Sequence, residues 1–149
     1  MSTIMSREER EAFLADVHVG VLSLNEAGRG PLTAPVWYSY EPGGEVQVVI
    51  ERVSRKGKLL EEGQRISLCA QQEAPPYKYA SVEGPVVRIE SSDVERCERA
   101  LAHRYLGVEA GDRYVESASD GRDDDEMLLV RMRPERWLTA DYSKEDVGL

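Results

Sequence analysis

The stretch from Lys78 to Glu90, KYASVEGPVVRIE, has the composition of one long β-strand whose apolar positions change face midway. Its apolar side chains fall on even-numbered positions as far as Val82 and on odd-numbered positions from Val87 onward. Because side chains alternate across a strand, this change requires a bulge or a bend, and Gly84-Pro85 stands where it occurs. Such a strand is typical of the corner of a β-barrel.

Shorter strand signals lie on both sides of this stretch. They are runs of β-branched and aromatic residues that alternate with polar ones and are separated by clusters of Gly, Pro and Asn. Successive strands joined by such short turns pair in antiparallel fashion. The expected strands are 19–24, 32–40, 46–51, 65–71, 78–90, 127–133 and 137–142.

Three helices are expected between these strands. Ser6 and Glu9 form a capping box, in which each side chain satisfies a free backbone amide of the first helical turn. Ser92 and Glu95 form a second one, and apolar residues follow it at helical spacing until Gly107. The expected helices are 7–16, 55–62 and about 92–107.

These elements predict a mostly β fold (α+β by helix count). The expected architecture is a small antiparallel β-barrel with one short and two flanking helices, because closure removes unpaired sheet edges. A parallel α/β fold is not expected, since only one helix is long enough for a crossover. Residues 1–149 are expected to form one domain, as no linker or repeat is visible.

Composition narrows the classes of partner and compartment. The 19 Lys+Arg against 28 Asp+Glu give a formal net charge of −9, which disfavours a nucleic-acid partner. With 41% hydrophobic and 32% charged residues the chain is too apolar for disorder and too charged for a membrane span. Cys69 and Cys97 give neither a disulfide framework nor a zinc spacing, and the N-terminus does not have the composition of a signal peptide. We therefore expect a cytoplasmic protein.

The basic residues are concentrated at one point. Arg52, Arg55, Lys56 and Lys58 fall within seven residues, around Ser54, where a strand ends and a helix begins. Free amides and the dipole at a helix start favour a phosphate, guanidinium and ammonium groups hold phosphate oxygens, and a serine hydroxyl adds a donor. The alternative is a solvated helix start whose charges pair with neighbouring glutamates.

Five further stretches stand out in this order along the chain: Val19-Gly20-Val21-Leu22-Ser23, Pro35-Val36-Trp37-Tyr38, Ser54-Arg55-Lys56 with Leu59-Leu60, Arg65-Ile66-Ser67-Leu68 and Val82-Glu83-Gly84. Their order and spacing resemble those of the pyridoxamine 5′-phosphate oxidase-like FMN-binding split-barrel flavoproteins and their F420-dependent (deazaflavin) relatives. The resemblance covers most of the chain. It implies a split β-barrel that forms a homodimer, with two cofactor clefts at the dimer interface.

The same resemblance implies FMN or F420 as cofactor and assigns residues to it. Arg55 and Lys56 would hold its phosphate, with Ser54 as an auxiliary donor and Arg52 and Lys58 as further candidates. The basic C-terminal motif with histidine of true pyridoxamine phosphate oxidases has no counterpart at 136–142, so vitamin B6 oxidation is not expected.

Other candidate residues come from the strands. Val49 and Ile50 would line the flavin ring by resemblance, and Trp37 is the aromatic residue expected in the cleft. His18 and His103 are far apart in sequence and lack a partner at ligand spacing, so no metal site is expected. No catalytic residue is assigned.

The expected function is that of an oxidoreductase transferring a hydride between F420 or FMN and a small organic substrate. A cofactor of this kind carries the reaction chemistry, so an acid–base pair in the protein is not required. A non-catalytic flavin- or haem-binding module for storage or sensing is the alternative. A barrel without cofactor, with a merely superficial basic corner, is a third interpretation.

Overall fold

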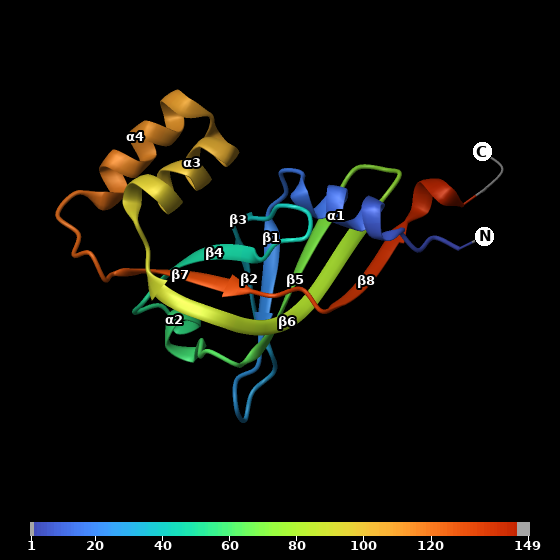
Figure 1. The fold of residues 1–149 in the computed structure, drawn as a ribbon, viewed down its shortest axis with the longest axis horizontal. Helices are drawn as coiled ribbons and strands as arrows, with labels where there is room; N and C mark the ends of the chain where they lie inside the picture. The colour runs from blue at the N-terminus through green and yellow to red at the C-terminus, as the bar shows by residue number, and fades with distance from the viewer. Residues whose placement is uncertain (1, 146–149) are drawn as a thin grey trace.

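The computed structural model describes residues 2–145. These residues form an antiparallel sheet that is curled into a half-barrel, together with four α-helices (Figure 1). Helix accounts for 29% and strand for 36% of the described residues, which confirms the predicted fold class. The strands are β1 Gly20–Leu24, β2 Leu32–Val36, β3 Tyr38–Ser39, β4 Val46–Glu51, β5 Arg65–Gln72, β6 Lys78–Ser91, β7 Met127–Met132 and β8 Arg136–Asp141.

The strand β6 is shared between two parts of the sheet. Its first half pairs with β5 on one edge and β8 on the other, and its second half pairs with β7. The predicted irregularity is present, but the register shifts between Val86 and Arg88, slightly beyond Gly84. Gly84 instead allows the backbone at Arg133 to pass close to β6, because a Cβ on residue 84 would lie 1.7 Å from the carbonyl oxygen of Arg133.

The expected strand 32–40 is interrupted at Trp37. Strand β2 pairs with β1, whereas β3 pairs with β4 at the opposite end of the strand order β2-β1-β5-β6-β7-β4-β3. The two ends of this order are therefore consecutive along the chain. This connection curls the sheet and leaves Trp37 at the turn between its two ends.

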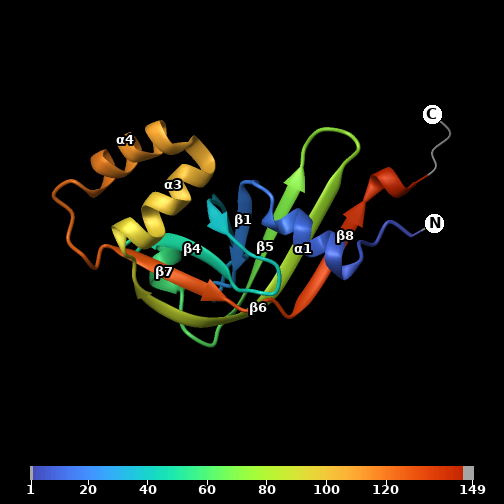
Figure 2. The same ribbon diagram turned by 45° about the horizontal axis from the view of Figure 1, so that its top comes forward.

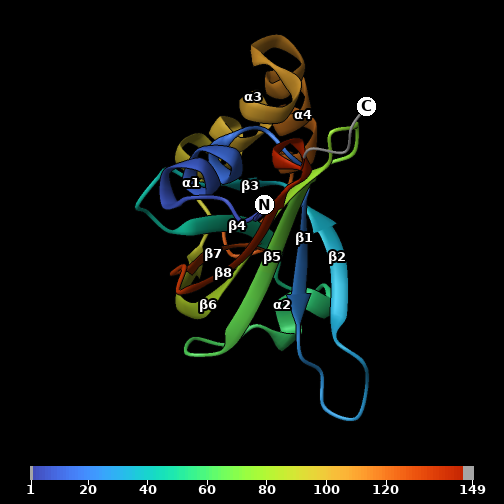
Figure 3. The ribbon, with the colours of Figure 1, turned by 90° about the vertical axis from the view of Figure 1, so that its right-hand side faces the viewer.

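The last helical region contains two α-helices instead of the single one expected. A π-helical turn, Val94–Glu98, leads into α3 Arg99–Leu106, and α4 Val108–Ser119 follows directly. The N-cap is Asp93, whose side chain accepts from the Arg96 amide at 2.8 Å, rather than the predicted Ser92. Figure 3 shows α3 and α4 side by side as a hairpin that projects beyond the sheet.

The other two helices match the prediction more closely. Helix α1 Arg7–Ala15 begins with the predicted Ser6–Glu9 capping box and packs two buried residues, Phe13 and Leu14, on the core. Figure 2 shows the helix lying along the part of the sheet formed by β5, β6 and β8. Helix α2 Arg55–Leu59 starts at the predicted N-cap Ser54 but ends earlier than expected. Within residues 2–145 no helix combines the length and apolar composition needed to cross a membrane.

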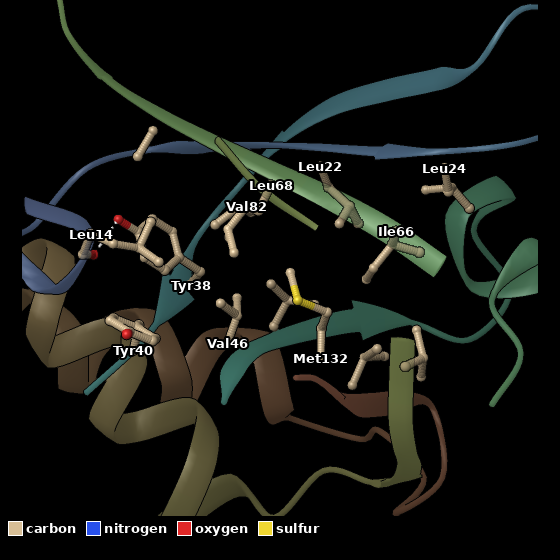
Figure 4. Packing of buried hydrophobic residues seen from close by; sticks show 14 of the residues in the cluster. Leu14, Leu22, Leu24, Tyr38, Tyr40, Val46, Ile66, Leu68, Val82 and Met132 are labelled. Atoms are coloured by element: carbon tan, nitrogen blue, oxygen red, sulfur yellow. Dashed lines mark hydrogen bonds between the residues drawn. The ribbon is translucent and has the colours of Figure 1, made fainter. Parts of the chain in front are cut away.

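The core fills the concave side of the curled sheet. Alternate residues of the strands point into it, and Tyr38 is fully buried among them (Figure 4). The Tyr38 hydroxyl donates to the Leu14 carbonyl at 2.7 Å, so its one polar atom is satisfied inside the core. Desolvation by this burial raises the pKa of Tyr38 well above its usual value. Other members of the cluster are Leu22, Ile66, Leu68, Val82, Val86, Val130 and Met132.

Candidate functional site

A cavity of about 490 Å³ lies between the sheet and the helical hairpin. Its walls come from the end of β2 with Trp37, the end of β4, the start of α2, the π-helical turn, α3, α4 and the start of β7. This volume falls within the range of roughly 300–1,000 Å³ that is usual for small-molecule and cofactor sites. The cavity is therefore large enough for a ring-bearing ligand.

Five of the eight residues predicted to bind a cofactor line this cavity. They are Trp37, Val49, Ile50, Ser54 and Lys56. The end of β4 and the start of α2 bring the last four together, since the chain passes directly from one element to the other. The part of the sequence that carried the prediction thus forms one wall of the cavity.

The other three, Arg52, Arg55 and Lys58, are exposed and do not line it. The Nε of Arg52 donates to the carbonyl oxygen of Asp125 at 2.6 Å. Arg55 forms an ion pair with Glu26, with Nε 3.1 Å from Oε2. This pair raises the pKa of the Arg55 guanidinium and lowers that of the Glu26 carboxyl, since each group favours the charged form of the other.

Ser54 has a structural role at the start of α2. Its Oγ donates to the Glu51 carbonyl at 2.6 Å and accepts from the Gly57 amide at 3.1 Å. Gly57 permits this close packing, because a Cβ there would lie 2.3 Å from the Glu51 carbonyl oxygen. The result is a tight turn that fixes the position of Lys56 at the cavity wall.

Among the described residues, Lys56 is the cation on this wall that forms no ion pair. Within residues 2–145 the lysines that form ion pairs are Lys78 and Lys144. The second cation of the cavity, Arg122, pairs with Glu98 at 2.5 Å. Lys56 is therefore available to an anionic group of a ligand.

Trp37 belongs to an aromatic cluster that sequence analysis did not find. Its ring stacks on Tyr105 of α3, with centroids 5.0 Å apart and planes at 6°, and lies 5.3 Å from the ring of Tyr114 of α4. Tyr105 covers one face of the indole, so Trp37 does not offer both faces to a ligand. Tyr114 lines the cavity with it.

Glu98 and Arg122 also line the cavity, and sequence analysis did not find them. Their side chains are 12% and 11% exposed, and they come from the π-helical turn and from the segment after α4. The two residues are 24 positions apart, and the fold of the helical hairpin brings them together. No local sequence pattern therefore predicts this ion pair.

Comparison with known proteins gives no match to a protein-family model and none to a curated protein sequence. Solved structures do match. The fold is that of the pyridoxamine 5′-phosphate oxidase-like split-barrel proteins, as the sequence resemblance implied.

Three of these structures illustrate the range of that fold. A conserved hypothetical protein of Mycobacterium tuberculosis, Rv2991, has a TM-score of 0.74 and 20% identity over 99% of this chain and 91% of its own. An F420 reductase has a TM-score of 0.69 and 17% identity over 86% and 94%. A FAD and haem binding protein of Mycobacterium smegmatis has a TM-score of 0.62 and 18% identity over 94% and 72%. At such identities the likeness concerns the fold.

Proposed function

We propose that this cavity binds a phosphate-bearing flavin-type cofactor, FMN or F420, and that the protein is an oxidoreductase acting on a small organic substrate. The observation that carries the proposal is the placement of Lys56, a cation without an ion pair within residues 2–145, in the same cavity wall as the apolar residue Val49. An F420 reductase among the structures of this fold supports the choice of cofactor.

The residues of the cavity fit such a group in two ways. Lys56 would hold the phosphate, and Val49 and Trp37 would line the ring, whereas the side chain of Ile50 is 2% exposed and packs in the core. The cofactor, when bound, supplies the hydride chemistry, while the side chains of this chain bind it, orient it and exclude water. Arg55 would join the phosphate only by leaving Glu26, so we assign it a secondary role.

The test is calorimetric titration of FMN and of F420 into the wild-type protein and two variants. Lys56→Ala should weaken the preferred cofactor's binding roughly ten- to hundredfold, because a hydrogen bond to a charged group contributes about 1.5–3 kcal/mol. Lys58→Ala is the matched control, since Lys58 is exposed and does not line the cavity. Equal affinity of the Lys56→Ala variant and the wild type would remove the phosphate assignment.

A non-catalytic binding module is the second candidate. The FAD and haem binding protein of the same fold favours it, and the same cavity residues would serve. Within residues 2–145 no histidine or cysteine lines the cavity, which makes a flavin a better fit than a haem held by either residue. Repeated reduction and reoxidation of the loaded protein with turnover of an acceptor would distinguish an enzyme from a storage module.

We further propose that the protein is a homodimer. On the outer face of the sheet, Val21, Cys69, Ser81 and Leu138 lie opposite one another in register across β1, β5, β6 and β8. Leu138 is 66% exposed and Val21 is 38% exposed. Such a row of apolar and small side chains suits a second copy of the chain.

The cytoplasm is the compartment we propose for this protein. Cys69 and Cys97 are both free thiols, a state that the reducing cytoplasm maintains.

A further inference from the structure

The helical hairpin supplies a part of the cavity lining to which the proposed function assigns no ligand. Leu101 of α3 and Tyr114 and Ala118 of α4 make up this part, which we call the hairpin wall. None of the three side chains carries a charge, and one of them is aromatic. The proposed phosphate ligand Lys56 belongs to a different element, α2. The hairpin wall therefore offers chemistry of its own.

The position of Tyr114 and Ala118 follows from the way in which α4 packs. Gly111 and Val115 are the buried residues of this helix, and a Cβ at Gly111 would lie 3.0 Å from the backbone of Ala102 on α3. Tyr114 and Ala118 are four positions apart, so they share one side of the helix. Both are exposed. A compound that covers them with apolar groups is favoured, because it removes apolar surface from water.

Tyr114 favours an aromatic compound over an aliphatic one. Its ring is 51% exposed and is tilted by 52° from the ring of Trp37, with the two centroids 5.3 Å apart. The residue that stacks on Trp37 is Tyr105, at 6° between the planes. Because Tyr114 is not stacked in this way, its ring can pair with a ring of a ligand. Such pairs contribute more to binding than the buried area alone.

The charges around the cavity disfavour an anionic compound beside the cofactor. The charged residues that line the cavity are Glu51, Lys56, Glu98, Arg122 and Glu126. Arg122 is paired with Glu98, whereas Lys56 forms no ion pair within residues 2–145. Once a cofactor phosphate occupies Lys56, the remaining charges of the lining are those of the carboxylates Glu51 and Glu126. A second anion would meet repulsion there and no available cation of the lining.

We propose that the hairpin wall binds the substrate of the oxidoreductase, and that this substrate is an aromatic compound without a negative charge. The proposal rests on the proposed function, which places the cofactor ring against Val49 and Trp37. Tyr114 packs against the substrate ring, and the small side chain of Ala118 leaves room for it. Tyr114 and Ala118 are thus specificity-determining residues of the same site.

Equilibrium dialysis with three related probes tests the proposal. The protein is first saturated with whichever of FMN and F420 it binds. The probes are 2-naphthol, which is neutral and aromatic, 2-naphthoate, which is aromatic and anionic, and decahydro-2-naphthol, which is neutral and saturated. We expect 2-naphthol to bind roughly tenfold or more tightly than 2-naphthoate, and about twofold or more tightly than decahydro-2-naphthol.

Substitutions on the hairpin wall locate the bound probe. Ala118→Leu fills the space beside Tyr114 and should weaken 2-naphthol binding roughly tenfold or more. Tyr114→Ala should weaken it and remove the preference over decahydro-2-naphthol, whereas Tyr114→Phe retains the ring and should keep that preference. Ser117→Leu is the matched control for Ala118→Leu, because Ser117 is exposed on the same helix and does not line the cavity. This control should bind 2-naphthol as the wild type does.

The outcomes separate this inference from the function beneath it. Cofactor-loaded wild type that binds no 2-naphthol, or binds either of the other probes equally well, would overturn the inference alone. The same holds if 2-naphthol binding is unchanged in folded Ala118→Leu or, where that variant does not fold, in Tyr114→Ala. Wild-type protein that binds neither FMN nor F420 would overturn the proposed function and this inference with it.

Discussion

At the residue scale, Gly84 decides how closely two strands approach. A Cβ at this position would lie 1.7 Å from the Arg133 carbonyl oxygen and 3.3 Å from Sδ of Met132. Because the first of these is backbone, it cannot move aside as a flexible side chain would. The missing side chain of Gly84 therefore leaves room for the backbone of Arg133 beside β6.

We expect Gly84→Ala to lower the free energy of unfolding by about 1–3 kcal/mol or more, the usual cost of forcing an extra group into a packed site. Urea denaturation measures this change. Gly30→Ala is the control, because a Cβ there meets nothing within 4 Å. Equal stability of both variants would mean that the strand crossing is looser than described here.

A second residue, Glu9, gives the N-terminal helix an acid-sensitive contact. Its carboxylate accepts from Nζ of Lys144 at 2.6 Å and from the Ser6 amide at 2.8 Å, and these bonds lower its pKa to about 2. Since the folded pKa lies below the ordinary value of 4.5, the contribution to stability is present above pH 4.5 and is lost as pH falls toward 2. Glu9→Gln should reduce the slope of stability against pH in this interval. An unchanged slope would contradict the assignment.

At the scale of elements, Tyr105 joins the helical hairpin to the barrel. Its hydroxyl donates to the His18 carbonyl at 2.6 Å and accepts from the Tyr38 amide at 3.0 Å. Arg104 adds a bond from Nη2 to the Ala15 carbonyl at 2.9 Å. Helix α3 is thus attached through side-chain to backbone bonds at the ends of α1 and β3.

Tyr105→Phe should destabilise the protein by about 1–3 kcal/mol, because the Tyr38 amide N–H then loses the hydroxyl oxygen that accepts its hydrogen bond. The ring, and with it the stacking on Trp37, is retained. Chemical denaturation measures the loss, and hydrogen exchange should show faster exchange at the Tyr38 amide. If that amide exchanges as slowly as in the wild type, the bond does not hold the hairpin.

The strands and the helix that ends at Gly107 could be predicted at this scale, whereas α4 and its pairing with α3 could not. Alternation marks strands, and Ser54 marks the start of α2, because both signals are local. Helix α4 has no side-chain N-cap, because the residue before it is Gly107, which also ends α3. It includes Gly111, which lies against the backbone of Ala102. Arg55 and Glu26 are 29 residues apart in the sequence. No local sequence pattern predicts that they form an ion pair.

At the scale of the whole molecule, the outer face of the sheet is the surface we assign to a second copy. Leu138→Glu places a charge on its most exposed apolar position and should shift the protein from dimer to monomer. Sedimentation at micromolar concentration measures this shift. Leu106→Glu is the control, since Leu106 is 42% exposed on α3, away from the sheet. A wild type that sediments as a monomer would contradict the assignment.

The molecule as a whole carries a net charge of −9, so it does not attract an anionic cofactor from a distance. Under the proposed function, binding comes from contacts inside the cavity, which Lys56 and Val49 both line. Sequence analysis located the first half of this site because it is contiguous. The second half, from α3, α4 and the π-helical turn, is formed only by the folded chain.

The most direct test of the account is a crystal structure of the protein grown with excess FMN or F420. The account predicts the cofactor in the 490 Å³ cavity, with its phosphate within hydrogen-bond distance of Nζ of Lys56 and its ring against Val49 and Trp37. A saturating cofactor found elsewhere on the protein, or a cavity that stays empty beside an intact Arg55–Glu26 pair, would contradict it.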